Sequence, residues 1–259
     1  RSTHEELSRW RAELAAKNWR LILPDATANQ QDTADVLIYG TVSPRALGEV
    51  ARTAEEQVAR IRKLFKVPAD EPLIKGRLTL YVFEKRFDYG EVGTMLEHRE
   101  IPAAWRGHWH YHPVDTYACV LLPSDGKIAG LIAEQIVGAY VASLGNVPPW
   151  FAEGTARAVA ARFDPKDPRV RAWDDQTVRA WQATDKPEGF LTGSLQQDDG
   201  DALSFGFVKS LMIPPTRHAA LIAALQQGTP FETAFAKVYG GSPRQIAANW
   251  SPRASKRGR

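Results

Sequence analysis

The chain has 259 residues, of which 44% are hydrophobic and 24% are charged. This size and composition are typical of a globular protein with a sizeable buried core. The formal net charge of +3 is too weak to indicate a nucleic-acid-binding protein. The sequence has no run of about 18 apolar residues, so no membrane span is predicted. The single cysteine, Cys119, excludes an intrachain disulfide and a cysteine-rich zinc site, and its apolar surroundings predict a buried, inert thiol.

Helices and strands alternate in the first half of the chain. A Ser/Thr start with early acids predicts the first helix, and Ser43 as N-cap with Pro44 behind it predicts the start of a long one. β-Branched and aromatic runs bounded by turn residues predict the strands. The predicted helices are residues 2–18, 43–66 and 84–96, and the predicted strands are 34–40, 76–83 and a pair within 107–123 joined by the turn "PVDT".

The second half of the chain is predicted to be helical. Two apolar helices joined by a Pro-Pro turn lie within residues 131–160, and Gly and Pro punctuate the helices that follow. Those later helices are residues 167–184, 201–212, 217–228, 230–240 and 242–250. The expected organisation is a helix and lead-in over 1–33, an α+β half over 34–163, a helical half over 164–250 and a basic tail over 251–259.

The segment "PPWFAEGTA", residues 148–156, is the most specific motif in the sequence. With "LTLYVFEKRFDYGEV" before it and "GTPFETAFAKVYGGSPRQIAANW" after it, the chain resembles the gluzincin metallopeptidases, specifically the peptidase-MA-like domains of bacteria. The resemblance covers roughly residues 34–250. It implies an α+β, zincin-like fold: a small N-terminal mixed sheet with helices, a helical C-terminal half and a cleft between them.

The active helix of that family carries H-E-x-x-H, in which two histidines bind zinc and the glutamate acts as general base. The glutamate of the W-[FL]-x-E-G helix is the third ligand. By resemblance, Glu134 stands at the base position and Glu153 at the third-ligand position, whereas Ala133 and Val137 replace the two histidines. Alanine and valine donate nothing to a metal, so zinc is expected to be lost and the domain to be a degenerate zincin, a pseudo-peptidase.

Three arrangements are open for the two remaining carboxylates. Glu134 and Glu153 could share a proton, because like charges close together raise one pKa. A basic side chain could replace the metal, and Arg157, four residues after Glu153, is the local candidate for such a pair. Alternatively, Glu153 has only a structural role at its helix.

The stretch "HWHYHP" is the other unusual feature. On a strand, His108, His110 and His112 would share one face and could hold a relocated metal, perhaps with one of the two glutamates. The alternative is that these histidines are surface or hydrogen-bonding residues. The nearby aromatic residues could line a groove for a peptide or glycan or pack in the core; they are Trp105, Trp109, Tyr111 and Trp150.

These patterns predict a catalytically inactive zincin-like module that binds a protein or peptide or takes part in an assembly, without a cofactor. The alternative is a hydrolase with a rebuilt site, built either on the strand histidines with a metal or on Glu134 and Glu153 as acid and base. No basic cluster with interleaved aromatic residues predicts a nucleic-acid partner. The resemblance implies an exported, extracytoplasmic bacterial protein, and a chain that starts without Met fits a trimmed precursor.

Overall fold

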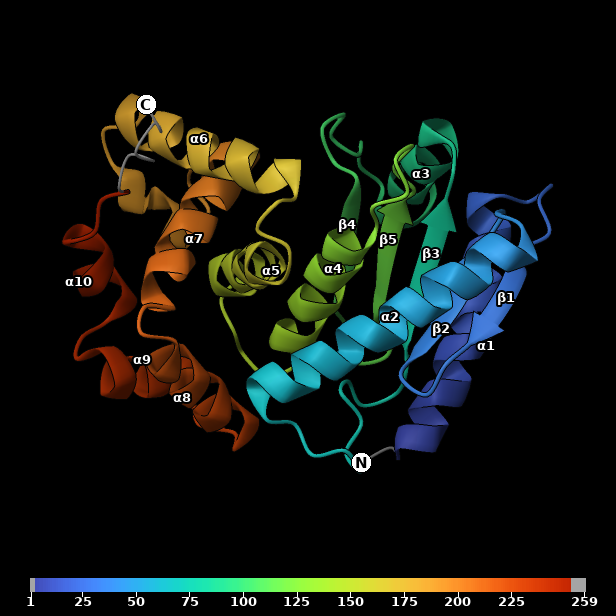
Figure 1. Ribbon diagram of the computed structural model, residues 1–259, viewed down its shortest axis with the longest axis horizontal. Helices are drawn as coiled ribbons and strands as arrows, with labels where there is room; N and C mark the ends of the chain where they lie inside the picture. Colours follow the sequence, from blue (N-terminus) through green and yellow to red (C-terminus); the bar gives the residue numbers. More distant parts are fainter. Residues whose placement is uncertain (1–2, 253–259) are drawn as a thin grey trace. The chain divides into compact units, whose positions relative to one another are not determined.

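The computed structural model describes residues 3–252 and divides into two compact units, Arg1–Ser143 and Leu144–Arg259 (Figure 1). The first unit combines a sheet with helices, and the second is helical. This architecture confirms the predicted α+β class, with a sheet in the N-terminal half and a helical C-terminal half. The zincin-like assignment stays a prediction. Of the predicted basic tail, residues 253–259 lie outside the described residues.

The sheet of the first unit has five strands in the order β1-β2-β3-β5-β4. The three central strands run parallel, and each edge strand pairs antiparallel with its neighbour, so the sheet is mixed. The central strands are buried along their whole length, which explains their continuous apolar runs. The strands are β1 (Asn29–Asp32), β2 (Val36–Gly40), β3 (Leu78–Phe83), β4 (Gly107–His110) and β5 (Tyr117–Leu121).

Helices cover both faces of this sheet. In Figure 1, α2 and α4 lie in front of the strands and α1 lies behind them. Residues of α1 and α3 form one core cluster with side chains of β2, β3 and β5, and Cys119 is a free, buried thiol within it, as predicted. The helical elements of this unit are α1 (His4–Ile22), α2 (Pro44–Phe65), α3 (Arg86–Val92), the π-helix η1 (Gly93–Glu97) and α4 (Ala129–Ala142).

The second unit packs its helices around aromatic side chains. The ring of Trp150 lies within 6.2 Å, between centroids, of five phenylalanine rings from α5, η2, α7 and α9. The helices are α5 (Pro149–Phe163), α6 (Pro168–Ala183), the 3-10 helix η2 (Pro187–Thr192), α7 (Gln197–Leu211), α8 (Pro215–Gln226), α9 (Phe231–Tyr239) and α10 (Pro243–Ala248).

The division between the units differs from the predicted ranges. The boundary lies between Ser143 and Leu144, so α5 belongs to the helical unit rather than to the α+β half. The physical reason is the close approach of α5 to α7: a Cβ on Gly154 would overlap the backbone of Ser204. In addition, the predicted N-terminal helix, α1, packs on the sheet as part of the first unit and is not a separate segment.

None of the helices within residues 3–252 combines the length and apolar character needed to cross a membrane.

Candidate functional site

Helix α4 carries the positions that the resemblance assigns to a zinc-binding helix. The helix is buried without a break from Gly130 to Val141, and this explains why it is apolar on all sides. Ala133 and Val137 are both 0% exposed, and Glu134 is 8% exposed. The two positions that histidines would occupy are therefore parts of the hydrophobic core.

The residues present do not fit a zinc centre on this helix. Zinc is bound by thiolate, imidazole or carboxylate groups, and a catalytic site needs three of them. Ala133 and Val137 have no donor atom. Among the described residues, no group of three or more His, Cys, Asp and Glu side chains is placed to hold a metal ion.

Glu153, at the predicted third-ligand position, lies on α5 and forms an ion pair within its own unit. Arg157 Nε donates to Glu153 Oε1 at 2.7 Å, which is the i,i+4 pair that the sequence predicted. The same guanidinium donates through Nη2 to Asp201 Oδ2 at 3.1 Å, and it lies 5.5 Å from the centroid of the Trp173 ring. Arg157 thus links two carboxylates, one on α5 and one on α7.

Asp201 is a member of this cluster that sequence reasoning missed. Burial and the negative charge of Glu153 raise its pKa to about 7, against the opposing charge of Arg157 and a hydrogen bond from Gln197. The residue lies 44 positions beyond Arg157 in the sequence. No local pattern connects two residues on different helices, so only the fold could reveal this contact.

Glu134 and Glu153 belong to different units. A proton shared between these two carboxylates therefore stays a prediction.

The three histidines of "HWHYHP" do not form one group of ligands. Strand β4 ends at His110, so His112 lies in the turn that follows, where its Nδ1 accepts from the Val114 N–H at 3.3 Å. His110 stacks on the ring of Tyr117 with centroids 5.0 Å apart. His108 and His110 share one face of β4, as predicted, and His112 lies beyond the end of the strand.

His108 is buried and uses both ring nitrogens in hydrogen bonds. Its Nε2 lies 2.7 Å from Glu97 Oε1, and its Nδ1 lies 2.8 Å from the hydroxyl of Tyr89. A metal ligand needs a free nitrogen lone pair, and neither ring nitrogen offers one in this arrangement. The structure therefore supports the hydrogen-bonding alternative for His108.

Glu97, at the end of η1, is the centre of this buried network. Besides His108, its carboxylate accepts from the Tyr117 hydroxyl at 2.8 Å and pairs with Arg99 at 2.6 Å. Burial alone would raise the pKa of Glu97, but the hydrogen bonds from His108 and Tyr117 and the charges of His108 and Arg99 outweigh it and lower the pKa to about 2. Sequence reasoning missed Glu97 because nothing in the helical pattern marks a buried acid there.

Strand β4 is an edge of the sheet and packs closely on α4. A Cβ on Gly107 would lie 2.7 Å from the carbonyl oxygen of Cys119 and 3.1 Å from Gln135 Nε2. That amide nitrogen of Gln135 is buried without a hydrogen-bond partner within residues 3–252. On the same face, the Trp109 ring occupies the space that a side chain at Gly138 would need. Small residues therefore bring the edge strand and the helix together.

The aromatic residues near the predicted cleft divide between packing roles. Trp150 is 6% exposed and lies in the core of the second unit, as its place in an apolar turn before the second helix favoured. Trp109 packs on α4, and Trp105 lies 5.0 Å from the guanidinium carbon of Arg99.

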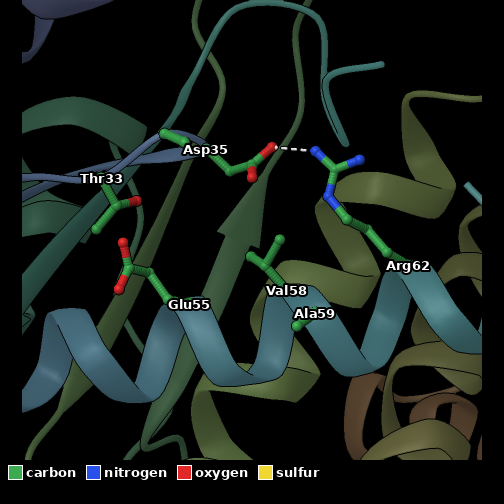
Figure 2. A pocket seen from close by; sticks show the side chains of 7 residues that line it. Thr33, Asp35, Glu55, Val58, Ala59 and Arg62 are labelled. Carbon is green, nitrogen blue, oxygen red and sulfur yellow. Dashed lines mark hydrogen bonds and ion pairs between the residues drawn. The ribbon is translucent and has the colours of Figure 1, made fainter. Parts of the chain in front are cut away.

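A small pocket on the first unit lies apart from all of these residues. It encloses about 220 Å³ between the β1–β2 turn and α2 (Figure 2). Arg62 pairs with Asp35 at 2.8 Å on one side of it, and Glu55 lies on the other. Arg62 also donates to the carbonyl oxygens of Pro68 and Glu71, so this ion pair ties a turn and a loop to α2.

No protein-family model matches the sequence, and no curated protein is significantly similar to it. The resemblance to gluzincin peptidases therefore remains a prediction.

Proposed function

We propose that this chain is a zincin-like domain without peptidase activity, which serves as a protein- or peptide-binding or assembly module. The observation that carries the proposal is the 2.7 Å ion pair between Arg157 and Glu153. The carboxylate at the third-ligand position already has a cationic partner, and that partner is a side chain.

The ion pair disfavours a metal at Glu153. The Arg157 side chain is 13% exposed and that of Glu153 is 22% exposed, so the pair is only weakly screened by water. A zinc ion at Glu153 would have to break this charge-assisted hydrogen bond and then meet a fixed positive charge beside it. The buried Ala133 and Val137 offer no donors that could offset that cost.

The position of β4 as the last strand of the sheet supports the binding part of the proposal. Leu121 N of β5 donates to the Arg106 carbonyl, and His112 N donates to the carbonyl of Asp115, just before β5. These two bonds and the strand register place the bonds to β5 at alternate residues of the segment 106–112. The backbone N–H and C=O groups of Gly107 and Trp109 then point to the free edge. An extended peptide can add to such an edge as a further strand.

Incubation of the purified protein with a mixed digest of a denatured protein tests this proposal. We expect the protein to retain peptides uncut, with and without added zinc. Cleavage that a chelator stops and that Glu134→Gln abolishes would instead identify a hydrolase with a rebuilt site. If zinc co-purified and His110→Ala removed it, the relocated metal site would be the better explanation.

A matched pair of variants tests the role of the β4 edge. Trp109→Pro removes one outward N–H without removing a bond to β5. Trp109→Phe keeps that N–H and an aromatic ring. We expect the proline variant to lose the retained peptides and the phenylalanine variant to keep them. Equal retention by both variants would show that peptides do not add to this edge.

A further inference from the structure

Helix α1 has an apolar stripe along the border between its exposed side and its buried side. Trp10, Leu14, Lys17 and Leu21 follow one another at spacings of four, three and four residues, which places them on one line along a helix. Trp10 is 45% exposed and Leu21 is 49% exposed. The neighbouring side of α1, about a third of a turn around the helix, is buried on the sheet. Its buried residues are Arg11, Ala15, Asn18, Trp19 and Ile22.

Further exposed hydrophobic side chains lie on segments that contact α1. Arg11 donates to the carbonyl oxygens of Pro113 and Val114, which holds the exposed Val114 beside α1. The neighbouring α3 and η1 pack against α1 and carry the exposed Phe87 and Met95. Within the described part of the first unit, the exposed large hydrophobic side chains thus all lie on or beside the layer formed by α1, α3 and η1.

The charges along the stripe make this surface complementary to itself. Glu13 and Arg20 are exposed, lie seven residues apart and flank the stripe on the side away from the core. When two such helices pack antiparallel, Glu13 of one copy meets Arg20 of the other, and the contact is made twice. A parallel pair would instead place Lys17 against Lys17.

We propose that the exposed face of α1 binds a second copy of this chain, with the two α1 helices antiparallel about a two-fold axis. In this arrangement Trp10 of each copy packs on Leu21 of the other, and Leu14 packs on the aliphatic part of Lys17. The single lysine in an otherwise apolar seam fixes the register of the pair, at some cost in stability. The mixed signs of the flanking charges favour this occupant over an anionic membrane surface, which would select a uniformly basic flank.

The dimer is expected to be weak and dependent on concentration. The stripe from Trp10 to Leu21 is about 17 Å long. An interface built mainly on it falls at or below the low end of specific interfaces, which is about 1,200 Å². The inference does not depend on the proposed function, because α1 and α4 cover opposite faces of the sheet.

Sedimentation velocity over a concentration series, from about 1 to 300 μM, tests this inference. We expect a monomer–dimer equilibrium and, for Trp10→Ala, a dissociation constant at least about tenfold higher, since aromatic anchors dominate such interfaces. A chain that stays monomeric over the whole range, or a dimer that Trp10→Ala does not weaken, would overturn the proposal.

A charge swap provides a second test with surface variants that keep the fold. Glu13→Arg should weaken the dimer by roughly fivefold, because it creates repulsion at two symmetric contacts. Adding Arg20→Glu to the same chain should restore the dimer. The control is Glu49→Arg in the exposed ion pair of Arg45 and Glu49 on α2, which should leave the dissociation constant of the dimer unchanged. Failure of the double variant to recover would exclude the antiparallel pairing.

Cross-linking distinguishes the antiparallel arrangement from a parallel one. Cys119 is fully buried, so an introduced surface cysteine is the reactive thiol of each variant. A mixture of Glu13→Cys and Arg20→Cys chains should form a disulfide between the two variants. Each variant alone should cross-link little, and efficient self-linking of Glu13→Cys would contradict the two-fold antiparallel pair.

Discussion

At the scale of single residues, Arg157 is the side chain on which the candidate site most depends. It bonds to Glu153 and Asp201 at once, and the side chains of all three are at most 22% exposed. Arg157→Ala leaves two partly buried carboxylates without their cation, which we expect to destabilise the second unit by roughly 3–5 kcal/mol. Arg45→Ala, which breaks an exposed ion pair on α2, should cost less than about 0.5 kcal/mol. Denaturant unfolding followed by far-UV circular dichroism measures both.

Glu97 should make the first unit sensitive to acid. Its pKa is lowered from 4.5 to about 2, because hydrogen bonds from His108 and Tyr117 and nearby positive charges outweigh burial. The stabilisation is therefore complete above about pH 4.5 and is lost as the pH falls through 2. Glu97→Gln should lower the free energy of unfolding by roughly 3 kcal/mol at pH 7. The stability of this variant should also change less between pH 4.5 and pH 2 than that of the wild type.

Cys119 allows the acid sensitivity of the first unit to be measured separately from that of the second. It is the only cysteine of the chain, and it is 0% exposed on β5. Its rate of reaction with a pyridyl disulfide, which works in acid, reports opening of the sheet. Equal pH dependence of that rate in wild type and Glu97→Gln would show that the network does not stabilise the fold.

At the scale of elements, close packing of α5 on α7 explains Gly154, the glycine of the segment "PPWFAEGTA". Gly154 lies where α5 meets α7, and a Cβ there would overlap the backbone of Ser204. Gly154→Ala should therefore destabilise the second unit by about 1–3 kcal/mol. Gly48→Ala on α2 is the matched control: nothing lies within 4 Å of its Cβ position, so it should stabilise the helix by up to about 1 kcal/mol. Thermal unfolding of the two variants should shift in opposite directions.

The sequence predicted most helices and strands because their signals are local. Ser43 caps α2 through the Ala46 N–H, and Pro44 follows it, as the sequence indicated. Strand β1 was missed because its sequence, "NQQD", is polar and mostly exposed at the sheet edge. The π-helix η1 was read as the end of a longer α-helix, since no local pattern distinguishes the two.

The candidate site was predictable only where its contacts are local. The pairing of Glu153 with Arg157 is a one-turn helix contact, and the sequence identified it. The bonds of Asp201 to Arg157 and of Glu97 to His108 join different elements, so the sequence contained no signal for them. The placement of α5 in the helical unit likewise depends on long-range packing.

At the scale of the whole molecule, the second unit should respond to pH through Asp201. Its pKa is raised from 3.8 to about 7 by burial and by the charge of Glu153. The stability linked to its protonation is complete below about pH 3.8 and is lost as the pH rises through 7. His218 acts in the opposite direction, because burial and the charge of Arg162 lower its pKa to about 4.

A comparison of wild type with Asp201→Asn isolates the contribution of Asp201 from that of His218. Relative to wild type, we expect the stability of Asp201→Asn to rise as the pH increases from about 4 to 8, because the asparagine cannot ionise. Hydrogen exchange of α7 at several pH values measures this gain. A difference between the two proteins that does not change with pH would mean that Asp201 is ionised throughout.

The proposal that this chain is a zincin-like domain without its zinc is tested most directly by metal analysis of the purified protein. After incubation with excess zinc and removal of the free ion, we expect fewer than about 0.1 zinc ions per chain and no cleavage of peptides. About one tightly held zinc per chain, together with peptidase activity that depends on Glu134, would contradict the proposal.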